Sequence, residues 1–142
     1  MVTLLELFSE NDQIKKWHQN LIEKKRQLML GLSTSTKALA IASSLKKEDK
    51  IVLLTSTYGE AEGIISDLIS ILGEEFVYPF LVDDSPMVEF LMSSQEKNIS
   101  RVEALRFLSD PSKKGILVCN IAASRLILPS STVFKESIIK IA

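Results

Sequence analysis

Residues 31 to 38 have the length and part of the composition of a phosphate-binding loop. Such a loop reads G-x-x-x-x-G-K-[ST]: its second glycine lets the backbone wrap the phosphates, its lysine neutralises them, and its hydroxyl coordinates magnesium. Thr36 stands where that glycine is required, and Ala38 has no hydroxyl to offer a metal. We therefore interpret the segment as a degenerate phosphate loop that holds no cofactor, made up of Gly31, Ser33, Ser35, Thr36, Lys37 and Ala38.

Nucleotide hydrolysis also needs a carboxylate after an apolar strand to hold the metal. The apolar run 116–119 is followed by Asn120, and the run 51–54 is followed by Thr55. Asp83 and Asp84 do follow an apolar run, but Pro79 interrupts it. We assign no catalytic residue and no metal ligand. The alternative of a nucleotide-binding fragment that uses Lys37 with a non-standard metal site stays open.

Two further side chains have reactive groups but no visible catalytic partner. His18 is the only histidine, and it lies beside Trp17 on the polar side of a predicted helix, so we expect it to be exposed or lightly packed. Cys119 is the only cysteine, which excludes an intramolecular disulfide and a cysteine-based zinc cluster. Within a buried strand it should behave as a small apolar residue.

The charges are unevenly placed along the 142 residues, although their formal sum is only -1. Residues 1–50 hold nine basic and six acidic side chains, residues 51–100 one and nine, and residues 101–142 seven and three. This distribution argues against a uniform nucleic-acid surface, because the acidic middle third would repel phosphates. A nucleic-acid-contacting module that works through Lys24, Lys25 and Arg26 remains an alternative.

The apolar spacing predicts a succession of short strands and helices. Helical patterns cover 3–23, 37–45, 61–72, 86–92, 101–108 and 121–126, the fifth opened by a capping box at Ser100. Continuous apolar runs predict strands at 27–30, 51–54, 76–82, 116–119 and 134–141. The third contains Pro79 and is therefore a strand end or an edge strand rather than a central strand.

Strands that do not alternate between apolar and polar residues, separated by helices, indicate a mostly parallel sheet covered on both faces. The predicted fold class is therefore a three-layer α/β/α domain over residues 25–130, preceded by helices in 1–24. Residues 131–142 begin another domain or form a connecting strand. No run approaches the roughly 20 apolar residues of a membrane span, so we predict a cytoplasmic protein with no membrane partner.

Several segments, in order, resemble the amino terminus of bacterial transcription-repair coupling factors. They are Leu4-Leu5-Glu6-Leu7-Phe8, Gly31-Leu32-Ser33, Lys37-Ala38-Leu39, Ser100-Arg101-Val102-Glu103-Ala104-Leu105 and Ala122-Ala123-Ser124-Arg125-Leu126. The resemblance implies that residues 25–130 belong to a module similar to the excinuclease B subunit (UvrB). Such a module has a RecA-like, P-loop NTPase-type fold whose phosphate loop has degenerated.

The resemblance also implies a function for a longer parent protein. Members of the family are ATP-driven DNA translocases that displace stalled RNA polymerase at DNA lesions and recruit the damage sensor, the excinuclease A subunit (UvrA). ATP and magnesium would bind in the motor domains of the parent, which also contact DNA. For the present segment we expect a non-catalytic scaffold whose partner is the rest of the same polypeptide.

Overall fold

A sheet of three parallel strands lies at the centre of the computed structural model, which describes residues 3–45, 49–83 and 95–137. The strands are β1 (Lys50–Thr55), β2 (Val77–Phe80) and β3 (Gly115–Asn120), in the spatial order β1-β3-β2. Both pairings are parallel, with Ile51 beside Ile116 and Phe80 beside Cys119. The predicted α/β class with a parallel sheet is confirmed.

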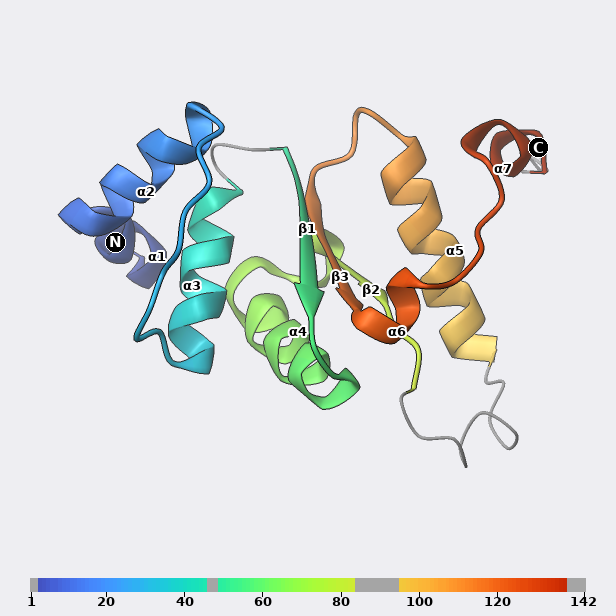
Figure 1. Cartoon of the computed structure of the whole chain (residues 1–142), viewed down its shortest axis with the longest axis horizontal. Coiled ribbons are helices and arrows are strands. Elements are labelled where there is room, and N and C mark those ends of the chain that lie inside the picture. Colours follow the sequence, from blue (N-terminus) through green and yellow to red (C-terminus); the bar gives the residue numbers. More distant parts are fainter. Residues whose placement is uncertain (1–2, 46–48, 84–94, 138–142) are drawn as a thin grey trace.

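Helices cover both faces of β3, which explains why its sequence does not alternate. All six of its residues are buried. Ile116 and Val118 belong to a core cluster with α3 (Thr34–Ser44) and α4 (Tyr58–Leu72), whereas Leu117 and Cys119 belong to a second cluster with α5 (Gln95–Ser109). Helices therefore lie on opposite sides of the sheet, giving three layers (Figure 1).

The helix ends follow the local signals in the sequence. Thr3 forms a capping box at α1 (Leu4–Ser9), Asn11 caps α2 (Asp12–Ile22), and Ser33 caps α3. These short polar side chains satisfy N–H groups that have no partner within the helix. At the other end of α4, Gly73 has φ 97°, a conformation that suits glycine.

The remaining elements are short. A single 3-10 turn, η1 (Glu74–Phe76), leads into β2, where Pro79 lies on an edge strand as predicted. The helix predicted at 121–126 is present as α6 (Ile121–Ser124), two residues shorter than expected. The helix predicted at 86–92 lies outside the described residues.

Two predicted strands are wrong where the structure describes them. Residues 25–30 are irregular, and the side chains of Leu28 and Leu30 are 81% and 82% exposed. A strand needs a neighbour for its backbone hydrogen bonds, and no described strand pairs with this segment. Near the C-terminus, α7 (Ser131–Glu136) replaces the start of the predicted strand because Ser130 caps it by accepting a hydrogen bond from the N–H of Val133. Residues 138–141 lie outside the described residues.

The boundary of α5 also differs from the prediction. The helix begins at Gln95 rather than Arg101, so Ser100 lies inside it and is not an N-cap. Gln, Glu and Lys have high helix propensity, and this extends the helix beyond the apparent capping box. Its inner side is fixed by Ala104 and Phe107, both fully buried.

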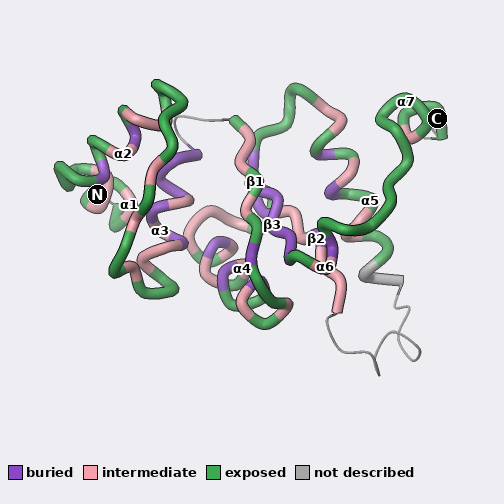
Figure 2. The backbone as a smooth tube through the Cα atoms, viewed as in Figure 1, coloured by how far each residue is buried: buried purple, intermediate pink, exposed green. Residues whose placement is uncertain are grey.

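Burial is concentrated on α3, α4, β3 and the inner side of α5 (Figure 2). The chain from α6 through α7 is mostly exposed, and Ile127 is 100% exposed. No helix among the described residues is both long and apolar enough to span a bilayer.

Candidate functional site

The residues of the predicted phosphate loop lie at the start of α3, and no strand precedes them among the residues that the structure describes. Gly31 has φ 79°, and a Cβ built on it would meet nothing within 4 Å. Ser33 and Thr36 bond to each other: their hydroxyl oxygens are 2.8 Å apart, and the Thr36 N–H lies 3.4 Å from the Ser33 Oγ. Ser35 is exposed. The strand-loop-helix frame expected from the sequence is therefore not formed here.

Ala38 serves the core of the domain. Its side chain is 0% exposed and lies in the cluster with Ala61, Ile64 and Leu68 of α4. A methyl group at this position allows α3 and α4 to approach closely, and a larger side chain would overpack a dense core. Close packing between α3 and α4 therefore requires a small side chain at position 38, where the motif would have a hydroxyl.

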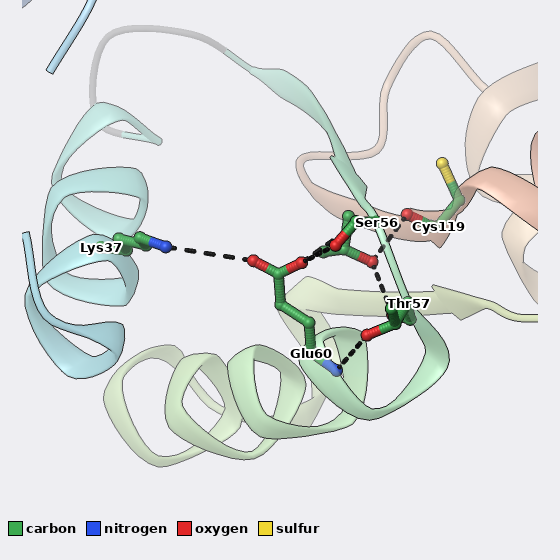
Figure 3. Close-up of polar contacts among 6 residues, drawn as sticks. Lys37, Ser56, Thr57, Glu60 and Cys119 are labelled. Carbon is green, nitrogen blue, oxygen red and sulfur yellow. Dashed lines mark hydrogen bonds and ion pairs between the residues drawn. The ribbon is translucent and has the colours of Figure 1, made fainter. Parts of the chain in front are cut away.

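Lys37 points across to α4, where its Nζ lies 3.9 Å from Oε1 of Glu60 (Figure 3). Both side chains are partly exposed, at 45% and 37%. An ion pair of this length near water contributes little to stability, at most about 1 kcal/mol. It does, however, place a negative charge beside the one cation that the predicted loop contains.

Glu60 is held by groups at the end of β1. Its Oε2 accepts hydrogen bonds from the Ser56 hydroxyl at 2.7 Å and from the Ser56 N–H at 3.1 Å (Figure 3). Those hydrogen bonds, helped by Lys37, lower the pKa of the Glu60 carboxyl. Thr57 caps α4 by accepting from the Glu60 N–H at 3.2 Å. The carboxylate is therefore fixed beside Lys37 in its charged form.

Ligands of parallel α/β sheets usually bind beyond the carboxyl ends of the strands. At that edge the Thr55 Oγ1 lies 3.1 Å from the Thr57 carbonyl oxygen and 3.4 Å from that of Cys119. Asn120 is 0% exposed; its Nδ2 donates to the Val82 carbonyl at 2.7 Å, and its Oδ1 accepts from the N–H groups of Val82 and Ala123. These polar groups are engaged within the fold.

Two carboxylates, those of Glu62 and Asp83, lie near Tyr58 at the start of α4. Burial raises the pKa of Tyr58, and a hydrogen bond to Glu62 and the charge of Asp83 raise it further. Asp83 therefore lies near Tyr58, at the start of α4. Asp84 lies outside the described residues.

The expectation that His18 is exposed is wrong. The side chain is 6% exposed, and its Nε2 lies 2.9 Å from the Ser43 hydroxyl, because α2 turns this side toward α3. The prediction for Cys119 is confirmed: it is 8% exposed, and burial raises the pKa of its thiol.

Sequence reasoning missed Glu60 as the partner of Lys37. A signal was present, since Thr57 and Glu60 form the T-x-x-E pattern of a helix start. That pattern predicts where α4 begins and that the glutamate turns back toward the chain before the helix. It does not predict that Lys37, on another helix, lies opposite.

The fold and the site define an α/β domain in which the residues of the predicted phosphate loop serve helix capping, core packing and an ion pair. No family model matches the chain, and no solved structure matches it significantly. It is 28% identical over 139 residues to the transcription-repair-coupling factor of Bacillus subtilis, which covers 96% of this chain and 12% of that protein. It is 31% identical over 102 residues to that of Staphylococcus haemolyticus, which covers 71% of this chain and 8% of that protein.

The resemblance to transcription-repair-coupling factors is therefore confirmed, and the chain corresponds to a part of such a protein. It spans about a tenth of the length of these curated relatives.

Proposed function

We propose that the chain is a non-catalytic, UvrB-like scaffold segment of a transcription-repair-coupling factor. Its role is to pack against the rest of the same polypeptide and to support the neighbouring domain that docks the damage sensor UvrA. By this contact it helps to hold the parent protein inactive until a stalled RNA polymerase is met.

The observation that carries this proposal is the pairing of Lys37 with Glu60. In a working loop the lysine neutralises the terminal phosphates of the nucleotide. Here a triphosphate would have to approach a carboxylate that Ser56 holds in place with two hydrogen bonds. The phosphates and this carboxylate are both negatively charged and would repel each other, and Ala38 has no side-chain hydroxyl for a magnesium ion.

The chemistry of the parent would then reside outside this segment. ATP and magnesium would bind to motor domains elsewhere in the longer polypeptide, and the same domains would move along DNA. RNA polymerase and UvrA would be met through other parts of the parent. The two relatives support this division, because each is many times longer than the matched region.

Calorimetric titration of the 142-residue chain with magnesium and ATP tests the proposal. We expect no saturable binding at millimolar nucleotide, and no difference between the wild type and Lys37→Ala. Saturable binding at physiological ATP that disappears in Lys37→Ala would instead establish the rival function, a nucleotide-binding fragment. Thr34→Ala, at the exposed first position of α3, is the matched control for a general disturbance of this helix start.

A further inference from the structure

The outer edge of β1 is open. The Gly115 N–H donates to the Asp49 carbonyl at 2.9 Å, and Lys50 is registered with Gly115. This hydrogen bond determines which backbone groups of β1 face β3. Backbone groups alternate in direction along a strand, so Ile51 and Leu53 face β3. Lys50, Val52 and Leu54 direct their N–H and carbonyl groups away from it, and these groups have no hydrogen bond to any described residue.

Two of the three side chains along this edge are apolar and incompletely covered, whereas the Lys50 ammonium donates to the Phe107 and Asp110 carbonyls. Val52 and Leu54 are 60% and 56% exposed. They are registered with Leu117 and Cys119 and so lie on the α5 face of the sheet. α5 packs against β2 and leaves the β1 side of that face open (Figure 1).

The opposite edge of the sheet is protected. Pro79 has no N–H to offer at the outer side of β2. The Leu81 carbonyl, just beyond that strand, accepts a hydrogen bond from the Arg101 guanidinium at 3.2 Å. Natural proteins protect sheet edges in such ways when no further strand is to be added. The contrast between the two edges singles out β1 as the edge that accepts one.

Exposed apolar side chains also lie on the other side of the sheet, beyond α3. Residues 25–30 run along the side of α3 that faces away from β1 (Figure 1). The Gln27 side chain ties this segment to α2, through the Asn20 amide at 2.9 Å and the Trp17 carbonyl at 3.1 Å. Its Leu28 and Leu30 are more than four-fifths exposed, an unusual state for two leucines.

We propose that a β-strand from the remainder of the same polypeptide, outside residues 1–142, pairs with the outer edge of β1. This inference rests on the proposed function, and it names the surface through which the scaffold meets its parent. The relatives are long enough to supply such a strand, since the matched region is only 12% and 8% of their lengths. The added strand would bond to Lys50, Val52 and Leu54 and cover the two exposed side chains.

Amide hydrogen exchange at single-residue resolution tests the inference, in the 142-residue chain and in the longer polypeptide from the same gene. In the chain alone, the amides of Val52 and Leu54 should exchange at least about tenfold faster than those of Ile51 and Leu53, which are bonded to β3. In the longer polypeptide all four should be protected alike. Fast exchange of Val52 and Leu54 in the longer polypeptide overturns the inference.

A pair of variants at Val52 gives an independent test of the added strand. Val52→Lys places a charge on the edge, whereas Val52→Thr keeps a β-branched side chain there. Neither should change the melting temperature of the 142-residue chain, because the site is exposed. In the longer polypeptide only Val52→Lys should lower the melting temperature and restore fast exchange of the Leu54 amide. Equal behaviour of the two variants there contradicts the added strand but leaves the nucleotide-titration test of the scaffold untouched.

Discussion

The Nε2 of His18 lies 2.9 Å from the Ser43 hydroxyl, so a polar contact between two buried side chains joins α2 to α3. Ser43 Oγ also lies 2.7 Å from the Ala40 carbonyl, to which only the hydroxyl can donate. Since a serine has one hydroxyl hydrogen, Ser43 accepts from His18, and Nε2 carries the proton in this arrangement. The contact fixes how the N-terminal helices lie on the α/β domain.

Replacing Ser43 by alanine should therefore destabilise the protein by about 1–3 kcal/mol, because the buried Nε2–H of His18 loses its acceptor. Ser44→Ala is the matched control. Ser44 is also buried and bonds only to the Ala40 carbonyl of its own helix. Denaturant unfolding at pH 7 measures both. Equal losses for the two variants would mean that the contact with His18 contributes nothing.

Lys24 has φ 55°, directly after the end of α2. Left-handed backbone costs an L-residue roughly 1–2 kcal/mol, and glycine avoids that cost. Lys24→Gly should therefore raise the free energy of unfolding by up to about 1 kcal/mol. Lys25→Gly, at the next position, should not stabilise, since Lys25 has no positive φ. Chemical denaturation of both variants decides the matter, and a loss of stability in Lys24→Gly contradicts the account.

Asn120 fills the place where a hydrolase would need a metal-holding carboxylate. Asn120→Ala should cost about 3 kcal/mol, since it leaves buried backbone groups of Val82 and Ala123 without their partner. Asn120→Asp has the same shape, but a charged carboxylate would face the Val82 carbonyl oxygen. Its protonated form can donate there, so its deficit relative to the wild type should shrink on acidification. A deficit that is constant between pH 7 and pH 4 would contradict this.

The parts of the fold that the sequence predicted have local causes. Asn11 and Ser33 cap helices through hydrogen bonds to residues two or three positions away, and Gly73 ends α4 by its own backbone conformation. The buried run before Asn120 needs only a sheet covered on both faces. Each of these signals lies within a few residues of the structure it determines.

The errors share a different cause, because they concern contacts between distant segments. Residues 27–30 have the composition of a buried strand, but whether they form one depends on a neighbouring strand that the local sequence does not specify. His18 follows polar neighbours along the chain, yet its burial depends on where α3 lies. In the site, the missing glycine and hydroxyl could be read from the sequence, whereas the Lys37–Glu60 pair depends on how α3 and α4 pack.

The pKa of Glu60 is lower in the folded protein, mainly because Ser56 donates hydrogen bonds to its carboxylate. A lowered pKa stabilises the fold above the unfolded-state pKa of about 4.3, and this contribution is lost as pH falls through the folded-state value. Glu60→Gln should therefore be less stable than the wild type at pH 7, by under about 1 kcal/mol because the site is partly exposed. The difference should vanish in acid. Denaturant unfolding of the wild type and Glu60→Gln at pH 7 and in acid measures this difference.

Restoring the phosphate-loop pattern should fail to restore nucleotide binding. The double variant Thr36→Gly, Ala38→Thr reads G-L-S-T-S-G-K-T, which matches the full motif. The threonine, however, replaces a fully buried methyl group between α3 and α4, and overpacking of this kind costs about 1–3 kcal/mol. Glu60 would still lie beside Lys37, and no described strand precedes the loop. We expect a lower melting temperature and no heat of binding with magnesium and ATP.

Two controls separate the causes of that failure. Ala38→Thr alone should account for most of the lost stability, whereas Thr36→Gly alone should weaken only the start of α3 by removing the Ser33–Thr36 contact. Adding Glu60→Gln to the double variant removes the competing carboxylate. If that triple variant bound nucleotide, the charge of Glu60 would be the barrier; if it did not, the missing strand-loop frame would be. Nucleotide binding by the double variant itself would contradict both reasons, because it would mean that two side chains alone had abolished the site.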